Sequence, residues 1–138
     1  MLNLSAEASA ALEDRLRAET IAWITTVTVD GQPQSSPVWF LWDEGEFLVY
    51  AQPHSWKVRN IRVQPKVALH LDTDADGGRV ATFEAVARIS EGQPPSHQVE
   101  AYLAKYRDAI ADLGWTPEQT AADYSTALRL TPTRVRVY

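Results

Sequence analysis

The sequence predicts a mainly β, α+β domain in which a small antiparallel barrel of five or six strands carries helices on its outside. Two observations lead to this fold class. Runs rich in β-branched and aromatic residues dominate the first two thirds of the chain, and the early ones are joined by short turns. Helical patterns are confined to the two ends of the chain and to one short segment, which places the helices at the periphery.

The first elements along the chain are a helix and a hairpin. A helix is predicted over residues 5–19, because Ser5 is a favourable N-cap residue. Two strands follow, over residues 21–29 and 32–42. Asp30-Gly31 between them is typical of a two-residue hairpin turn.

Proline constrains where the later strands can lie. Pro37 lies inside the strand over residues 32–42, and proline cannot donate a hydrogen bond to a neighbouring strand. We therefore expect that strand at an edge of the sheet or at a bulge. Further strands are expected over residues 47–52, 67–71 and 80–91, and a last one, interrupted at Pro132, over residues 128–130 and 133–138.

Two more helices are predicted near the C-terminus. Apolar residues recur at helical spacing from Ser96 to about Leu113, and Gly114 ends this helix. Thr116-Pro117-Glu118-Gln119 then begins another helix, with an N-cap threonine, a proline in the first helical position and a capping-box glutamine. The buried face of the longer helix is predicted to consist of Val99, Leu103, Tyr106 and Ile110.

Two predicted strands are apolar on both faces, over residues 38–42 and 47–50. A barrel needs apolar side chains only on its inner face, so the outer face is expected to contact something else. No other chain is implied, and the simplest partner is a second copy of the same chain. The sequence therefore predicts a homodimer whose interface includes the outer faces of these two strands.

Length, composition and charge restrict the class of protein. The chain of 138 residues is expected to form a single domain, 1–138, that buries roughly two-thirds of the surface of the unfolded chain. The net charge of −5 argues against a dedicated nucleic-acid-binding protein. No apolar run reaches membrane-spanning length and the N-terminus lacks a signal sequence, which favours a cytoplasmic protein without stable membrane insertion.

Several kinds of active site are not expected. The absence of cysteine excludes disulfides, thiolate metal sites and a cysteine nucleophile. The segment 72–77 begins like a calcium-binding loop, but Phe83 stands where the closing acidic ligand should be, so an acidic loop is predicted and no metal site. The sequence shows no serine-nucleophile motif, no glycine-rich nucleotide loop and no evident acid–base pair. Catalytic residues therefore stay unassigned, and any chemistry is expected to come from a cofactor.

One segment predicts a binding site for an anion. A strand ends at Pro53, and Ser55 is placed to be the N-cap of a short helix, whose start carries free N–H groups and positive potential. Lys57 lies in the first turn of this helix, and Asn60 shares its face. No acidic residue lies between positions 47 and 71 to cancel this potential. The alternative is a connecting helix whose basic residues are only solvated.

Two tryptophans flank the segments that would form the walls of the anion site. Trp39 lies in the second predicted strand, and Trp56 lies at the start of the short helix. Flat apolar side chains beside a phosphate-binding helix end are suited to a flat, anionic cofactor.

The sequence resembles a known family at this point. Residues 30–42, 52–62, 67–72 and 131–138 closely resemble the split β-barrel flavin- and deazaflavin-binding oxidoreductases. These are the pyridoxamine 5′-phosphate oxidase-like proteins, and the actinobacterial deazaflavin (coenzyme F-420)-dependent reductases are the most similar. The resemblance implies a six-stranded antiparallel split β-barrel of the FMN-binding type. It also implies a homodimer that binds two cofactors at its interface.

The resemblance also implies roles for individual residues. Lys57 would contact the cofactor phosphate, with Ser55, Trp56 and Asn60 nearby. Gln52 would lie against the polar part of the cofactor. Arg79 would reach the site from the second subunit. The ring of the cofactor would be lined by Ser36, Pro37, Val38 and Trp39.

The predicted function follows from this resemblance. We expect an oxidoreductase that uses reduced deazaflavin (coenzyme F-420) to transfer a hydride to a small unsaturated or quinone-like acceptor. The alternatives are an FMN-dependent oxidase or reductase of the same fold and a non-catalytic flavin- or haem-binding module. Pyridoxamine phosphate oxidation is not expected, because the chain stops at Tyr138 without the longer basic C-terminal region of those family members. Ser55 also stands where many members have a second basic residue.

Overall fold

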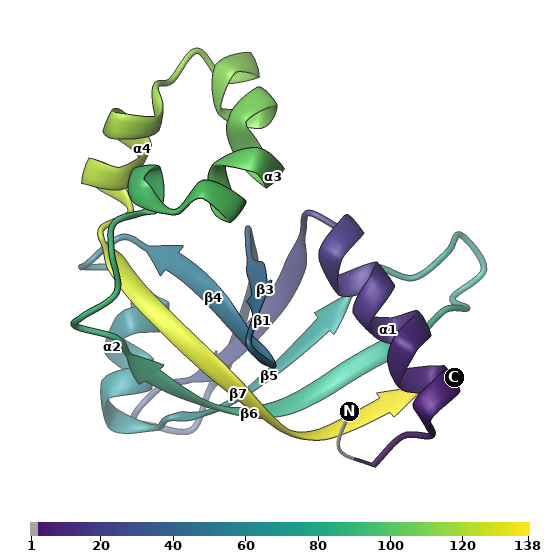
Figure 1. The fold of residues 1–138 in the computed structure, drawn as a ribbon. Coiled ribbons are helices and arrows are strands. Elements are labelled where there is room, and N and C mark those ends of the chain that lie inside the picture. Colours follow the sequence, from purple (N-terminus) through teal and green to yellow (C-terminus); the bar gives the residue numbers. More distant parts are fainter. Residues whose placement is uncertain (1–2) are drawn as a thin grey trace.

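A computed structural model describes residues 3–138 and contains a single antiparallel sheet of seven strands in this range. The order across the sheet is β2-β1-β5-β6-β7-β4-β3, and the sheet curves into an open barrel (Figure 1). The predicted fold class is confirmed, although with seven strands rather than six. Residues 1 and 2 of the predicted domain lie outside the described residues. The strands are β1 (Ala22–Val27), β2 (Pro33–Val38), β3 (Leu41–Asp43), β4 (Glu46–Ala51), β5 (Lys66–Leu71), β6 (Ala81–Ile89) and β7 (Thr126–Val137).

The seventh strand arises because the predicted strand over residues 32–42 is broken at Trp39 and Phe40. Its first part, β2, pairs with β1 at one edge of the sheet, and its second part, β3, pairs with β4 at the other edge. The chain therefore crosses from one edge of the open barrel to the other between Val38 and Leu41. Pro37 lies in the edge strand β2, as the sequence predicted.

One predicted turn and one predicted strand differ in detail from the structure. The β1–β2 hairpin has a three-residue loop rather than a two-residue turn: the Thr28 N–H donates to the Gln32 carbonyl at 2.9 Å, and the Gly31 N–H donates to the Thr28 carbonyl at 2.9 Å. Gly31 has a φ of 88°, the left-handed conformation that ends this kind of loop. The last strand, β7, is continuous through Pro132, because a bulge beside Pro132 absorbs the irregularity.

The first and the last helix begin with the predicted side-chain caps. Ser5 accepts a hydrogen bond from the Ala8 N–H at the start of the first helix, and Thr116 and Gln119 form the predicted capping box at the start of the last one. The predicted helix over residues 96–113 begins with a separate 3-10 turn. The helices are α1 (Ala6–Ala18), α2 (Trp56–Val63), the 3-10 helix η1 (Ser96–Gln98), α3 (Glu100–Asp112) and α4 (Pro117–Asp123). Within residues 3–138, no helix combines the length and the apolar character needed to span a membrane.

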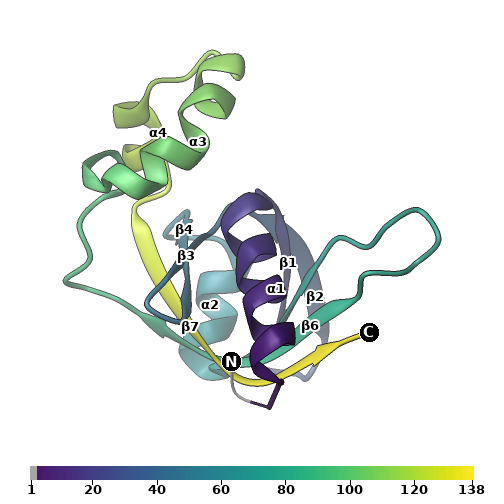
Figure 2. The same cartoon turned by 45° about the vertical axis from the view of Figure 1, so that its right-hand side comes forward.

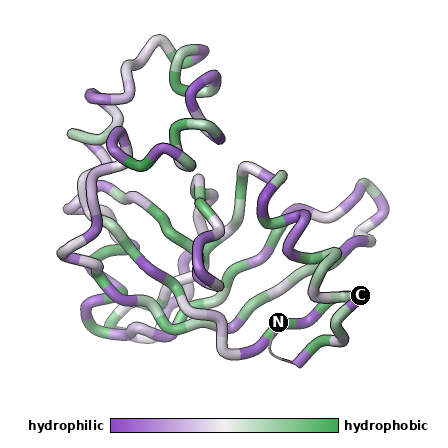
Figure 3. The backbone as a smooth tube through the Cα atoms, viewed as in Figure 1, coloured by the Kyte–Doolittle hydropathy of each residue, from purple (hydrophilic) through white to green (hydrophobic). Residues whose placement is uncertain are grey.

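The buried residues form two clusters on opposite sides of β4. The larger cluster fills the inside of the curved sheet and is closed by α1, with Leu12 and Leu16 fully buried. The smaller one lies between β4 and the helical layer of α3 and α4, which stands beyond one end of the sheet in both Figure 1 and Figure 2. The hydropathy colouring of Figure 3 shows hydrophobic segments on β4 as well as on α3. The smaller cluster consists of Leu48, Tyr50, Tyr102, Tyr106, Ile110 and Ala127.

This smaller cluster corrects the sequence-based argument for a dimer interface. Leu48 is fully buried and Tyr50 is 7% exposed, and both are covered by α3 of the same chain. The outer face of residues 47–50 is therefore covered within the chain, and the expectation that a second copy covers it was wrong. The predicted helical face also differs, because Tyr102 is buried in place of Val99 and Leu103, which are only partly buried.

Candidate functional site

Two adjoining cavities meet at the start of α2 and form one groove. The first, which we call the polar cavity, has a volume of about 430 Å³ and lies between the strands β1 and β2 and the N-terminus of α2. The second, which we call the aromatic cavity, has a volume of about 260 Å³ and lies between the sheet and the α3–α4 layer. Lys57 lines both cavities.

The linings of the two cavities differ in chemistry but share one electrostatic feature. The polar cavity is lined by Thr26, Gln34, Ser35, Ser36, Gln52, Ser55, Trp56 and Lys57. The aromatic cavity is lined on the sheet side by Pro37, Val38, Trp39, Tyr50 and Ala51, and on the helical side by Tyr102, Leu113, Trp115, Thr120 and Tyr124. No aspartate or glutamate is among these residues, and Lys57 is the one lysine or arginine that lines the groove in the part of the chain described. The groove is therefore suited to a neutral or anionic ligand.

Lys57 is partly buried in the first turn of α2 and has no partner among the residues that the structure describes. Within residues 3–138, no hydrogen bond or ion pair joins its ammonium group to another residue. Burial lowers the pKa of Lys57, because part of the water that stabilises its charge is removed. An anion bound beside Lys57 would stabilise that charge, so the arrangement favours an anionic ligand at the junction of the two cavities.

Ser55 lies at the N-cap position of α2 but does not cap it with its side chain. Its backbone has the extended conformation of an N-cap residue, with φ −68° and ψ 154°. Its hydroxyl makes no hydrogen bond to the helix, and the oxygen is enclosed without a partner in the described structure. A buried hydroxyl without a partner is costly. Ser55 lines the polar cavity, so a rotation of its side chain would let a ligand there supply the missing hydrogen bond.

Asn60 lies behind the wall of the polar cavity. It is 5% exposed, and its side-chain amide donates to Thr26 Oγ1 at 2.9 Å and to Gln34 Oε1 at 3.0 Å. Thr26 and Gln34 both line the cavity. In this chain Asn60 therefore attaches α2 to β1 and β2 and positions the two cavity residues.

Trp39 forms part of the wall of the aromatic cavity and is held by α3. Its ring stacks on the Tyr106 ring, with centroids 4.7 Å apart and planes 7° from parallel. The adjoining Phe40 has no strand partner, and its N–H donates instead to Tyr106 Oη at 2.8 Å. The Phe40 carbonyl accepts a hydrogen bond from Lys105 Nζ at 2.9 Å. The break between β2 and β3 is thus stabilised by side chains of α3.

The structure brings together eight of the ten residues that the sequence resemblance predicts to bind a cofactor. Asn60 lies behind the cavity wall, as described above. Arg79 lies outside the groove, near the C-terminus of the chain, where it lines a surface cavity beside α1. The eight residues of the groove are Ser36, Gln52, Ser55, Trp56 and Lys57 in the polar cavity and Pro37, Val38 and Trp39 in the aromatic cavity.

Sequence reasoning missed the helical side of the aromatic cavity. The side chains of Leu113, Trp115 and Tyr124 reach it because the chain reverses direction at Gly114, which has a φ of 76°. In the sequence, the one available signal was Trp115, a large aromatic residue directly after this helix-ending glycine. Its side chain is 43% exposed in the structure. Helical periodicity alone does not show which element a helix end will face.

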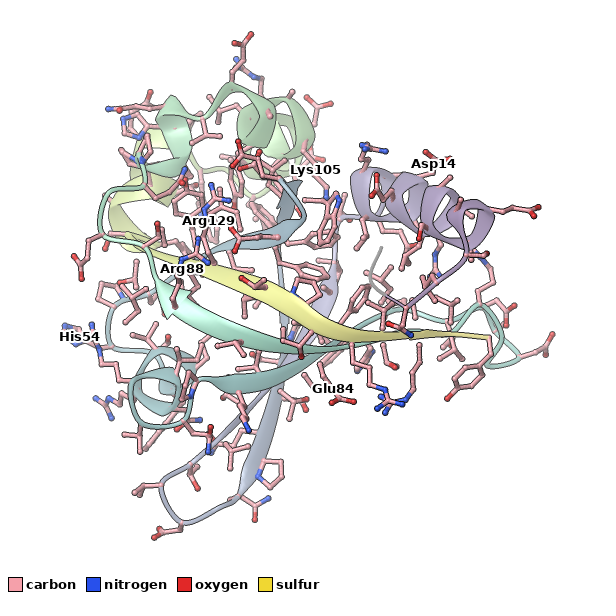
Figure 4. All side chains as sticks on the ribbon, turned by 60° about the horizontal axis from the view of Figure 1, so that its bottom comes forward. Asp14, His54, Glu84, Arg88, Lys105 and Arg129 are labelled. Carbon is pink, nitrogen blue, oxygen red and sulfur yellow. The ribbon has the colours of Figure 1, made fainter. Side chains whose placement is uncertain are left out.

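The acidic segment and the histidines lie outside the groove. Asp74 accepts backbone hydrogen bonds from Asp76 and Gly78 within the loop between β5 and β6, so its carboxylate stabilises the loop. His54 lies on the exposed turn before α2 (Figure 4), and His70 stacks on Trp23 on the outer face of the sheet. In residues 3–138, no three histidine, aspartate or glutamate side chains gather as they would around a metal ion.

Comparison with known proteins identifies similar sequences and folds. Residues 8–138 match the sequence profile of the pyridoxamine 5′-phosphate oxidase family. A conserved hypothetical protein of Mycobacterium tuberculosis has a similar structure, with a TM-score of 0.76 and 25% identity over 98% of this chain and 85% of that protein. An F420 reductase matches with a TM-score of 0.65 and 24% identity, over 90% of this chain and 94% of the other. The haem storage protein HutZ of Vibrio cholerae matches with a TM-score of 0.67 and 19% identity, over 93% of this chain and 92% of HutZ.

Proposed function

The chain belongs to the pyridoxamine 5′-phosphate oxidase family, a family of flavin-binding oxidoreductase type, and we propose that it is a reductase that uses reduced deazaflavin (coenzyme F-420). The acceptor of the hydride would be a small unsaturated or quinone-like compound. The observation that carries the proposal is the partly buried Lys57 ammonium without a protein partner at the junction of the two cavities.

The division of the groove supports a cofactor with a phosphate and a flat ring. In the polar cavity, Lys57 and the unpartnered Ser55 hydroxyl would hold the phosphate, and Gln52 and Ser36 would contact the polar chain. In the aromatic cavity, the sheet side with Trp39 would lie against the ring. The bound deazaflavin would supply the hydride. The protein would bind and orient the two reactants and limit the access of water.

A homodimer is part of the proposal, on different grounds from those in the sequence. Arg79 has a φ of 57° and lies outside the groove of its own chain, so only a second copy could bring it to a cofactor. Sedimentation equilibrium of the purified protein at micromolar concentration tests this point. We expect a dimer, and a stable monomer would remove both the dimer and the role of Arg79.

The test of the cofactor is an equilibrium titration of the purified protein with coenzyme F-420, FMN, FAD and haem, each followed by fluorescence. We expect coenzyme F-420 to bind most tightly. Preferential binding of FMN would replace the deazaflavin with the alternative cofactor. Binding of haem alone would favour a non-catalytic module, for which the fold of the haem storage protein is a precedent.

Binding is separated from catalysis by a second measurement. Reduced coenzyme F-420 is mixed with the protein and a small quinone, and the oxidation of the cofactor is followed by absorbance. We expect oxidation that depends on both the protein and the quinone. Tight binding without any such turnover would mean that the protein stores or shields the cofactor rather than using it.

A further inference from the structure

We infer that Tyr102 is a specificity-determining hydrogen-bond donor of the aromatic cavity, and that the cavity binds a flat ring system through a carbonyl oxygen placed against the Tyr102 hydroxyl. The inference rests on the proposed function, which it extends by naming the chemistry recognised in the aromatic cavity. The oxygen belongs either to the ring of the cofactor or to the acceptor, and the experiment below separates these two sources.

The Tyr102 hydroxyl has no hydrogen-bond partner in the described part of the chain, although its side chain is almost completely buried. Tyr102 is 3% exposed and lines the aromatic cavity. Within residues 3–138, its hydroxyl makes no hydrogen bond. The side-chain atoms that are fully enclosed without a partner are Ser55 Oγ, His97 Nδ1 and Arg129 Nη1, and the Tyr102 hydroxyl is not one of them. The hydroxyl oxygen is therefore not fully enclosed, and we infer that it opens onto the aromatic cavity, which Tyr102 lines.

The neighbouring tyrosines show that this free hydroxyl is unusual for its surroundings. The Tyr102 ring lies 5.1 Å from the Tyr50 ring and 4.9 Å from the Tyr106 ring. Tyr50 donates its hydroxyl hydrogen to the Pro94 carbonyl at 2.7 Å. The Tyr106 hydroxyl donates to the Thr20 carbonyl at 2.6 Å and accepts from the Phe40 N–H. In this packed group of three, two hydroxyls form hydrogen bonds within residues 3–138, and the hydroxyl of Tyr102 is left for a ligand.

The chemistry of the cavity defines the class of ligand. Trp39, Trp115 and Tyr124 provide aromatic walls, and such walls favour a flat apolar ring. Tyr102 and Lys57 provide donors, and none of the described residues that line the cavity carries a carboxylate to attract a cation. Burial raises the pKa of Tyr102, so its hydroxyl stays protonated and donates a hydrogen bond at neutral pH. The expected ligand is a neutral or anionic ring compound that presents an oxygen acceptor.

A matched pair of ligands tests the hydrogen bond. Menadione and 2-methylnaphthalene share one fused ring skeleton, but only menadione carries carbonyl oxygens. The chain has no cysteine for the quinone to alkylate, and binding is followed by quenching of tryptophan fluorescence. Tyr102→Phe keeps the packed ring and removes only the hydroxyl. We expect it to weaken menadione binding about 3- to 10-fold, as for one net hydrogen bond, and to leave 2-methylnaphthalene unchanged.

The matched control is Tyr50→Phe, because the Tyr50 hydroxyl lies in the same group of rings but is already bonded to Pro94. It should not alter the ratio of menadione to 2-methylnaphthalene affinity. An unchanged ratio in Tyr102→Phe, together with an unchanged affinity for riboflavin, would overturn the inference. Failure of both ring compounds and of riboflavin to bind the wild-type protein would also overturn it.

Titrations with cofactor show whether the carbonyl oxygen belongs to the cofactor ring or to the acceptor. If it belongs to the acceptor, Tyr102→Phe weakens menadione binding, measured by equilibrium dialysis, in protein saturated with coenzyme F-420. If it belongs to the cofactor ring, Tyr102→Phe weakens riboflavin and coenzyme F-420, and saturation with the cofactor abolishes the effect on menadione. If coenzyme F-420 binding depends on Lys57, and Tyr102→Phe weakens neither the cofactor nor menadione, the proposed function stays intact and only this inference is refuted.

Discussion

The start of α2 and the middle of α3 each contain a partly buried lysine, and the two lysines differ in the hydrogen bonds that they make. Burial lowers the pKa of both, to about 8 for Lys105. Lys105 Nζ donates to the Phe40 carbonyl at 2.9 Å and to the Leu16 carbonyl at 3.3 Å, and it lies 3.8 Å from the centroid of the Phe40 ring. Figure 4 shows Lys105 between α3 and α1. Lys57 has no such partner in the described chain.

This difference separates a structural charge from a ligand-binding charge. Burying a charged group without a partner lowers the stability of the fold. A partly buried charge that the fold leaves without a partner is therefore expected to serve in binding. Lys105 joins three elements that are distant in the sequence. Lys57 lies at the junction of two cavities, where its ammonium group can bind an anionic ligand.

The largest expected effect concerns Lys105. Lys105→Met keeps most of the aliphatic stem but removes the charge and both hydrogen bonds, so the Phe40 and Leu16 carbonyls lose a charged donor. We expect the free energy of unfolding to fall by about 1.5–3 kcal/mol, as measured by urea denaturation. The matched variant Lys57→Met should change it by less than about 0.5 kcal/mol. Equal destabilisation by the two variants would break the comparison.

The next largest effect is on binding at Lys57. Lys57→Ala removes the charge beside the proposed phosphate site, and a hydrogen bond to a charged group contributes roughly 1.5–3 kcal/mol. We expect the affinity for coenzyme F-420 or FMN to fall about 10- to 150-fold, measured by fluorescence titration, without a change in fold or oligomeric state. The control is Arg62→Ala, in the exposed last turn of α2, which should change affinity little. An unaltered affinity in Lys57→Ala would remove the site assignment.

A third prediction uses a carboxylate that is as well satisfied as Lys105. The hydrogen bonds from Arg88 lower the pKa of Glu46 from 4.5 to about 2, and Thr131 and Arg129 act in the same direction. Figure 4 shows Arg88 and Arg129 close together beside β7. Because the folded-state pKa is the lower one, this stabilisation is complete above about pH 4.5 and is lost as the pH falls toward 2.

The measurement compares wild type with Glu46→Gln by urea denaturation at several pH values. Arg88 is 54% exposed, so solvent screens part of the interaction. We expect the stability advantage of the wild type to shrink by about 1–2 kcal/mol between pH 6 and pH 2. An advantage that does not depend on pH would show that the carboxylate charge is not what the arginines stabilise.

The smallest expected effect is that of salt on the groove. The Lys57 ammonium is partly exposed to solvent, so added salt should screen its attraction for an anion. Raising sodium chloride from about 0.05 to 0.5 M should weaken cofactor binding roughly 2- to 5-fold in the wild type. Lys57→Ala should show little further weakening. The same salt dependence in both proteins would point to diffuse charge along α2 rather than to Lys57.

The amino-acid sequence by itself determined the features that depend on neighbours in the chain. The capping box of Thr116 and Gln119 joins residues three positions apart, and it formed as predicted. The strands and the start of α2 likewise follow from alternation, proline and capping positions. Lys57 and Ser55 were placed together at the mouth of a helix because that juxtaposition is local.

Only the tertiary structure decided the break in the second predicted strand and the helical side of the groove. The Phe40 N–H and carbonyl find their partners in Tyr106 and Lys105, which are 66 and 65 residues away in the sequence. Nothing local to Phe40 signals that a helix will replace its strand partners. The same helix covers the outer face of β4, which the sequence had left to a second copy, and it exposes Tyr102 to the cavity. Such contacts depend on how distant elements pack, and side-chain periodicity along one element does not contain that information.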